Sequence, residues 1–599
     1  MVTPVTTPRR TLNRALTASA LFAAFGLSYL PGLHDTFALF DRGAGIGALF
    51  TAPGLTAVPP SWVFRHALLL AGVFFLAPAL APLGRILLNW VGRAREGLGD
   101  WMVVGILGAA TALAAAGLAY ASLGAEGHVW DEREFDFQAR ILASGRLTAT
   151  APATDERVTL EGGGKNNFLV GTNEGVRDRK WFTIYMPVWP AALAIGEALG
   201  RPWLVNPVIG FITAFILFGY ARRLVGADGA LLAVLLYTLS PFILFNNASF
   251  FSEPVFLLLF LLFLWAYDAA KGGKKGAALA AGALLSLSFG AREYAAFAAA
   301  LPVVALWVYG VIRRREPARG LAWFVPGIIL GAAPLLAYNA VTGGNPFRFP
   351  RFYALKTHFG LSLPFLSGDM ALFTTRRLWV FATDLLGWPL ASALPALVPL
   401  FLKKIPPRLK PLYLAAAATM LLFVLPHHKG INYGARYYYG LLPAALVGGG
   451  WGLTLLPEWL TRRWRAAAGT AAVAALLAFA ALTVPYLAAV EPIYRDYWGF
   501  PEGKKPWVTP QLEQALSEYG VWQAVIFVAP PARCDGPAPN DVALKNDIIF
   551  ARDRGPLNAN FAATLPPRPC LLCDYREFEE TGTLRVIDAA PPPKTGVKK

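Results

Sequence analysis

Long apolar runs recur along most of the chain, and they constrain the fold more than any other feature. A helix needs about 20 apolar residues to cross the hydrocarbon core of a bilayer. Runs of this kind stand near residues 15–33, 66–84, 101–124, 203–221, 228–246, 253–270, 276–293, 295–312, 320–340, 378–402, 411–427, 441–457 and 467–488. With 56% hydrophobic and only 15% charged residues, the composition excludes an ordinary soluble protein. We expect about thirteen transmembrane helices.

The segment 183–199 is apolar as well, but it carries Pro187 and Pro190. Proline removes a backbone donor and breaks helix continuity. We therefore expect a re-entrant or interfacial helix here and not a further span.

The net charge of +17 would suit a nucleic-acid-binding protein, but the distribution of basic residues argues against one. Basic residues cluster at alternate ends of the expected spans, within 9–14, 85–95, 222–223, 271–275, 313–319, 403–410 and 462–465. If the N-terminus is cytoplasmic, all these clusters are cytoplasmic, as the positive-inside rule requires. The charge thus predicts a multi-pass protein of the inner (plasma) membrane with no nucleic-acid partner. The first apolar run has no convincing cleavage site, so we expect it to be retained.

This orientation places the loops 125–182, 246–252, 341–377 and 428–440 on the outer face. From Glu491 onward the long apolar runs stop, while 521–528 and 547–550 have the composition of short buried strands and 509–519 that of a helix. The predicted fold class is an α-helical polytopic membrane protein with a small extracytoplasmic C-terminal α/β domain. Its two domains would be 1–489, with an outer catalytic loop at 125–182, and 490–599.

Three cysteines stand in this tail, at positions 534, 570 and 573. Cys570-x-x-Cys573 is a weak metal signal, because a structural zinc site needs a second pair of ligands. A disulfide on an oxidising face stays open, with one cysteine left over.

Ionisable residues are scarce inside the spans, and charged and other polar residues gather at their predicted outer ends. The residues concerned are Asp131, Glu132, Glu253, Arg292, Glu293, Asn339, Arg348, Arg351, His358, His427, His428 and Arg436. A transporter would place such groups near the midplane, within discontinuous helices. An outer rim suits a reaction between a lipid-borne group and an outside molecule, in which an acid serves as general base and arginine holds a phosphate.

Short motifs surround several of these residues and follow one another along the chain. They are Asp131-Glu132, Tyr185-x-Pro187-x-Trp189-Pro190, Ser240-Pro241-Phe242, Ser249-Phe250-Phe251-Ser252-Glu253-Pro254, Gly290-Ala291-Arg292-Glu293-Tyr294, Tyr338-Asn339-x-x-Thr342-Gly343 and Gly434-Ala435-Arg436-Tyr437-Tyr438-Tyr439. In this order, over roughly residues 100–450, the chain resembles the GT-C superfamily of integral-membrane glycosyltransferases. The branch it is most similar to holds the protein O-mannosyltransferases and the bacterial aminoarabinose transferases.

This resemblance implies an inverting hexosyl- or pentosyltransferase that takes a sugar from a polyprenyl-phosphate lipid. The acceptor would be a hydroxyl of a glycan, lipid or protein outside the membrane. The implied site residues are Asp131, Glu132 and Glu253 for catalysis, Arg292 and Arg436 for the donor phosphate, and Tyr185 and Tyr437 for the substrate. Some relatives carry a lysine before a Pro-Pro pair where this chain has Tyr185-Met186-Pro187. No cofactor is firmly implied, and a divalent metal stays open.

Most of these residues also have a structural interpretation. Asp131 and Glu132 suit the N-terminus of a helix, Arg292 and Arg436 suit interfacial anchoring, and Tyr437 suits an aromatic belt. Other functions also stay open: a polytopic transporter or flippase, an oligosaccharide ligase or polymerase of the cell envelope, and a non-catalytic scaffold. The loop 146–180 has no clear periodicity, which predicts either a lid over the site or a passive surface loop.

Overall fold

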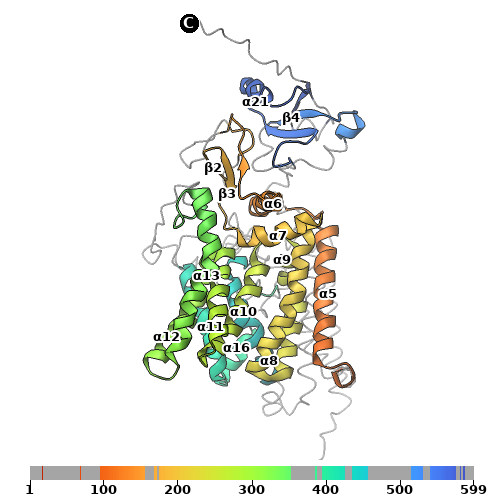
Figure 1. Cartoon of the computed structure of the whole chain (residues 1–599). Coiled ribbons are helices and arrows are strands. Elements are labelled where there is room, and N and C mark those ends of the chain that lie inside the picture. The colour runs from red at the N-terminus through yellow and green to blue at the C-terminus, as the bar shows by residue number, and fades with distance from the viewer. Residues whose placement is uncertain are drawn as a thin grey trace, which may run out of the picture.

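In the computed structural model of the chain, the described residues are 95–127, 129–155, 167–170, 174–351, 385–387, 394–424, 435–455, 515–529, 540–574 and 585–586, with single residues at 17, 20, 68, 93 and 581. Upright helices form one bundle, short helices lie across one of its ends, and two small sheets lie beyond those (Figure 1).

Long apolar helices make up the bundle. The described residues contain five helical segments long and apolar enough to cross a membrane: α5 (Asp100–Ala121), the segment Pro202–Leu239, α10 (Glu253–Lys271), α12 (Glu293–Ile312) and α13 (Ala318–Gly343). Shorter helices complete it: α9 (Pro241–Ala248), α11 (Lys275–Ala291), α16 (Leu394–Phe401), α17 (Lys410–Val424), and the irregular turns η3 (Pro407–Leu409), η4 (Arg436–Leu441) and η5 (Ala444–Gly448). The expected spans at 15–33, 66–84 and 467–488 and most of 378–402 lie outside the described residues, so the count of about thirteen stays a prediction.

The segment Pro202–Leu239 consists of η1 (Pro202–Leu204) and α8 (Val205–Leu239), and α8 reverses direction halfway. Gly226 has φ 79° and ψ 175°, a conformation that favours glycine and breaks the helix. The contacts with α5 show the reversal. Trp203 lies against Tyr120 near the end of α5, whereas Asp228 bonds to Arg95 just before its start. Thr238 then bonds to Thr111 further along α5, so the second half of α8 runs back. The two arms of α8 lie side by side, since the Tyr237 hydroxyl donates to the Gly210 carbonyl at 3.3 Å. They correspond to the spans expected at 203–221 and 228–246, but the second arm ends at Leu239.

Small residues allow α11 and α13 to approach each other at backbone distance. A Cβ atom on Gly327 would lie 2.1 Å from the Leu279 carbonyl oxygen, and one on Gly331 would lie 2.6 Å from that of Ala283. Such close packing replaces the hydrophobic driving force that helices lack inside a lipid bilayer.

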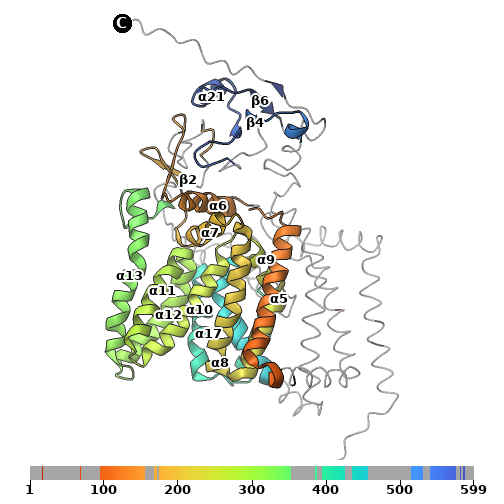
Figure 2. The same ribbon diagram turned by 45° about the vertical axis from the view of Figure 1, so that its right-hand side comes forward.

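Two short helices, α6 (Trp130–Ala143) and α7 (Val188–Ala198), lie across the end of the bundle and not along it (Figures 1 and 2). Phe135 and Ala139 on one face of α6 pack against Trp189 of α7. The position of α7 agrees with the interfacial helix expected over 183–199. It also fixes α6 against the bundle.

The loop after α6 contains an antiparallel sheet, which the sequence analysis did not predict. Strands β1 (Ala149–Thr150), β2 (Glu174–Arg177) and β3 (Lys180–Thr183) pair in the order β1-β3-β2. The hairpin turn is formed by Asp178 and Arg179, whose φ angles are 51° and 60°. Asn and Gly usually mark such turns. Because this turn contains neither Asn nor Gly, the sequence carries no signal for the hairpin.

The tail forms a second sheet, of four strands in the order β5-β4-β6-β7. Its strands are β4 (Ala524–Val528), β5 (Ile548–Arg552), β6 (Cys570–Cys573) and β7 (Arg585–Val586), with η6 (Gly555–Leu557) and α21 (Asn558–Ala562) following β5. Strand β4 is parallel to β5 and β6, and β7 is antiparallel to β6. The strands expected at 521–528 and 547–550 are β4 and β5, whereas an extracytoplasmic location stays a prediction.

This second sheet shares a hydrophobic core with α6 and the loop sheet. Phe137 and Ile141 of α6 lie in one cluster with Trp181 of β3 and Phe527 of β4. Arg140 Nη1 also donates to the carbonyl of Asn540 at 2.7 Å. Helix α6 is thus held between the bundle on one face and the tail on the other.

Cys570 and Cys573 are both buried and both free. They lie three positions apart in β6 and belong to different clusters, one on each face of the sheet. The Cys570-x-x-Cys573 spacing therefore forms neither a disulfide nor a common metal site in this strand. Cys534 lies outside the described residues.

Candidate functional site

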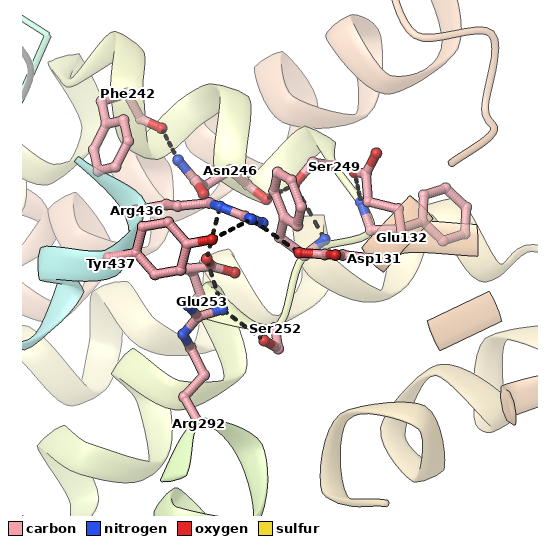
Figure 3. A network of polar contacts seen from close by, with 12 residues as sticks. Asp131, Glu132, Phe242, Asn246, Ser249, Ser252, Glu253, Arg292, Arg436 and Tyr437 are labelled. Carbon is pink, nitrogen blue, oxygen red and sulfur yellow. Dashed lines mark hydrogen bonds and ion pairs between the residues drawn. The ribbon is translucent and has the colours of Figure 1, made fainter. Parts of the chain in front are cut away.

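Charged side chains from four separate segments meet where α6 crosses the bundle. Asp131 comes from the first turn of α6, Glu253 from the first residue of α10, Arg292 from the junction of α11 and α12, and Arg436 from η4. We call this group the Arg436 network (Figure 3). All four were predicted from the sequence, and the fold brings them together.

Arg436 stands at the centre of the network. Its side chain is only 3% exposed, and its Nη2 donates to Asp131 Oδ2 at 2.9 Å and to the Tyr437 hydroxyl at 3.0 Å. Its guanidinium carbon lies 4.3 Å from the ring centroid of Phe251 and 4.8 Å from that of Tyr437. Aromatic faces stabilise a buried guanidinium by cation–π attraction while leaving its edge able to bind an anion.

Glu253 links the two arginines of the network. Its Oε1 lies 2.8 Å from Arg292 Nη1 and 4.0 Å from Arg436 Nε, and its side chain is fully buried. An unpaired buried charge is strongly unfavourable. Two guanidinium groups and two carboxylates therefore balance one another in this network.

A local break in the helices places Arg292. Helix α11 ends at Ala291, α12 begins at Glu293, and Arg292 between them has the non-helical angles φ −151° and ψ 89°. Gly290, two residues earlier, has no room for a side chain, since a Cβ there would lie 2.6 Å from Val188 of α7. The glycine-then-arginine motif thus lets α7 approach closely while it directs the arginine toward Glu253 and Ser252, whose Oγ accepts from Nη1 at 3.2 Å.

Asp131 forms the accessible edge of the network. Its side chain is 29% exposed, and its Oδ1 accepts a hydrogen bond of 2.6 Å from the Tyr185 hydroxyl. Burial alone would raise the pKa of Asp131, but the Arg436 charge and the Tyr185 hydroxyl outweigh that effect and hold the pKa below its usual value. Asp131 is therefore an ionised carboxylate beside a fixed cation.

Glu132 lies in a different environment from its neighbour. Its Oε1 accepts from the backbone N–H of Phe250 at 2.8 Å, and its Oε2 accepts from that of Val129 at 3.2 Å. The second bond closes the N-terminus of α6 in the manner of a capping box. This geometry suits an anchor for the backbone better than the catalytic role that the sequence suggested.

The connection 249–252 carries Phe251 and Ser252. It is held by Asn206 and Trp189, which the sequence analysis did not assign to the site. Asn206 Nδ2 donates to the carbonyls of Ser249 and Phe251 at 2.6 and 2.9 Å, and Trp189 Nε1 donates to that of Phe250 at 2.8 Å. A buried asparagine in an apolar helix was the available signal, because such a group needs partners. Trp189 belonged to a motif, but its hydrogen bond could not be foreseen.

Arg351 was noted only as one of the polar residues at the outer ends. It lies at the described end of the segment after α13, where its Nη1 is 3.5 Å from Glu293 Oε1. It is also close enough to Asp131, Tyr185 and Tyr437 to interact with them electrostatically. His427 and His428 lie outside the described residues. Among the residues described, no group of three or more His, Cys, Asp or Glu side chains is placed to hold a metal ion.

The chain matches no protein-family model and no curated protein. Its fold is similar to that of ArnT, an aminoarabinose transferase from Cupriavidus metallidurans, in a crystal structure bound to undecaprenyl phosphate. That match has a TM-score of 0.50 and 15% identity, and it covers 82% of this chain and 99% of that one. The structure of the same protein in the apo state gives a TM-score of 0.49 and 15% identity, over 80% and 94% of the two chains. The first likeness shows an ArnT-like fold.

Proposed function

We propose that the protein is a membrane glycosyltransferase that moves a sugar from a polyprenyl-phosphate lipid to an acceptor hydroxyl on the outer face of the inner membrane. The observation that carries this proposal is the Arg436 network, because it joins buried guanidinium groups to an accessible carboxylate at one end of an apolar bundle. The ArnT-like fold supports the choice of a lipid-linked donor, since the ArnT structure was bound to undecaprenyl phosphate.

In this proposal Arg436 and Arg292 bind the donor phosphate. A guanidinium group suits this role because it forms paired hydrogen bonds with phosphate oxygens and keeps its charge when buried. The arginines would also stabilise the negative charge that grows on the phosphate as the bond to the sugar breaks. Glu253 holds both guanidinium groups in place.

Asp131 is the proposed general base. It would take the proton of the acceptor hydroxyl while the hydroxyl oxygen attacks the anomeric carbon and the polyprenyl phosphate leaves, which gives inversion in a single displacement. A phosphate bound to Arg436 would compete with Asp131 for the guanidinium. Because burial by itself raises the pKa of Asp131, losing this partner would make the carboxylate a stronger base once donor is bound.

The two tyrosines are proposed to contact the substrate. The Tyr185 hydroxyl bonds to Asp131, and the ring of Tyr437 lies against both Arg436 and Arg292. Both side chains therefore border the position that a sugar would occupy between base and phosphate. Glu132 is proposed to position the start of α6 through its two backbone bonds.

Lipid analysis of deletion and wild-type cells would test the reaction. A transferase predicts that deletion cells accumulate a polyprenyl-phosphate sugar and lose one surface glycan modification. Purified protein in liposomes should then transfer that sugar to the acceptor. If the purified protein only moves the intact lipid between leaflets, the flippase alternative replaces this proposal.

The orientation needs a separate test, for which the structure supplies a matched pair of exposed carboxylates. Asp178 lies in the β2–β3 turn and is 74% exposed, whereas Asp228 lies in the turn of α8 at the other end and is 76% exposed. In a cysteine-free background, Asp178→Cys should react with an impermeant thiol reagent in intact spheroplasts, and Asp228→Cys should react only after lysis. The reverse pattern would place the Arg436 network on the cytoplasmic side and exclude outer-face transfer.

A further inference from the structure

A second pair of acids lies behind Asp131, away from the Arg436 network. Glu134 is one turn further along α6 and 1% exposed, and Glu174 at the start of β2 is fully buried. Gln138, one turn further along α6, bonds to Thr183, the register partner of Glu174, so Glu134 lies on the side of α6 that faces Glu174 and interacts with it electrostatically. Two buried carboxylates can adopt such an arrangement only when a proton or a cation lies between them.

The surroundings of the pair favour a proton. Trp181 Nε1 donates to Glu174 Oε2, so one acceptor position is already taken by a neutral donor. The charge of Arg552 on β5 also acts on Glu134. One shared proton would leave a single negative charge on the pair, which Arg552 offsets, whereas a divalent cation would add positive charge beside a guanidinium.

The pair belongs to a longer contact between α6 and the loop sheet. Gln138, one turn beyond Glu134, accepts from the Thr183 N–H at 3.2 Å and donates to the Leu147 carbonyl at 3.1 Å. Thr183 of β3 is the register partner of Glu174. Glu134 and Gln138 thus join one side of α6 to the paired strands β2 and β3.

We propose that Glu134 is a positioning residue that shares a proton with Glu174, and that this proton ties α6 to the β2–β3 hairpin so that Asp131 stays beside Arg436. A second ionisation would set the two carboxylates against each other and push α6 from its support. The consequence for transfer rests on the proposed function. The proton-dependent contact between Glu134 and Glu174 does not rest on the proposed function.

The charged groups around Glu134 support this assignment. Burial raises the pKa of Glu134, the charge and hydrogen bond of Glu174 raise it further, and so does Asp131 on the same helix; Arg552 opposes them without reversing the shift. The pKa of Glu134 is therefore well above its ordinary value. The protonated Glu134 therefore stabilises the folded protein fully below the pKa of a glutamate in the unfolded chain, about 4.3. This stabilisation is lost as the pH rises from there through the pKa of Glu134 in the folded protein.

The test compares thermal unfolding of the purified full chain in detergent across the pH range, in wild type and three variants. Glu134→Gln can donate permanently to Glu174 and should remove part of the alkaline fall in Tm. Glu174→Gln should also remove part of the alkaline fall in Tm, because its amide can donate permanently to Glu134. Asp178→Asn changes an exposed carboxylate on the same hairpin and should keep the wild-type pH profile. A wild-type profile in both Gln variants would overturn the proposal.

Transfer activity gives the second measurement. Wild-type activity should fall toward alkaline pH, Glu134→Gln should retain it there, and Glu134→Ala should lose about tenfold or more at every pH because Asp131 is misplaced. Equal losses in the Gln and Ala variants would overturn the positioning role. If wild type transfers no sugar at all, the proposed function fails, and the unfolding profiles still decide the shared proton. A rise in wild-type Tm with Mg²⁺ or Ca²⁺ that Glu134→Gln lacks would replace the proton by a cation.

Discussion

Two clusters of arginine and carboxylate stand at opposite ends of the bundle, with similar contact distances and different surroundings. In the Arg436 network, Arg436 and Glu253 are 3% and 0% exposed. In the second group, which we call the Arg95 cluster, Arg95 bonds to Asp100 at 2.9 Å and to Asp228 at 2.6 Å, while Arg222 lies 3.9 Å from Asp100. There Asp228 is 76% exposed and Arg222 is 48% exposed.

Ion-pair geometry alone therefore does not identify a functional site. Exposed pairs are weakened by water and salt and contribute at most about 1 kcal/mol. Buried pairs cost desolvation energy that their own attraction often fails to repay, so a buried pair is weak evidence for a role in stability. The Arg95 cluster suits the topology signal of its basic residues, and the Arg436 network suits chemistry.

The largest difference between the clusters should appear in stability. Glu253→Gln leaves Arg292 and Arg436 short of one buried anion, which should lower the free energy of unfolding by about 3 kcal/mol. Asp228→Asn in the Arg95 cluster should lower it by less than about 1 kcal/mol. Thermal or denaturant unfolding in detergent measures both, and equal effects would break the comparison.

Asp131→Asn should separate the clusters in activity. The amide keeps the size of the side chain but removes the basic carboxylate, so turnover should drop by about 100-fold or more if Asp131 is the general base. The matched control Asp228→Asn should stay within about fivefold, since an exposed pair is worth about 1 kcal/mol or less. The expression levels of both variants should equal that of the wild-type protein. Turnover of Asp131→Asn within that same fivefold range would remove Asp131 from the mechanism.

Arg436→Lys should have a smaller effect, confined to the donor. Lysine keeps the positive charge but loses the planar fork, and a lost hydrogen bond to a charged group is worth about 1.5 kcal/mol. The KM for the lipid donor should therefore rise about tenfold, while Arg222→Lys in the other cluster leaves it unchanged. Saturation with donor as in wild type would make Arg436 an anchor of the fold and not a ligand for phosphate.

The smallest effect should be the response to salt. Exposed charges are screened over about 8 Å at physiological ionic strength, whereas buried charges are screened much less. The stability difference between wild type and Asp228→Asn should shrink at high salt, and that between wild type and Glu253→Gln should persist. If both differences shrink together, water reaches the Arg436 network as freely as it reaches the Arg95 cluster.

The sequence predicted long apolar helices, the strands β4 and β5, and a larger set of polar residues at the span ends that contains all four members of the Arg436 network. These follow from local properties: apolar length set by bilayer thickness, basic residues at alternate ends, and costly ionisable groups kept at the other ends. The same rules predicted that Asp131, Glu253, Arg292 and Arg436 would lie at one end of the bundle. They could not predict which of them would touch.

Only the tertiary structure decided the pairings. Asp131 and Arg436 are 305 positions apart, and Glu132 reaches the Phe250 backbone across 118 positions. It also decided that Asp131 and Glu132, adjacent in the chain, differ in environment, because successive residues of a helix point about 100° apart. The burial of Glu134 against Glu174 depends on a hairpin whose turn carries no sequence signal. Packing between distant segments sets the partners of each charge, and no local pattern of residues encodes it.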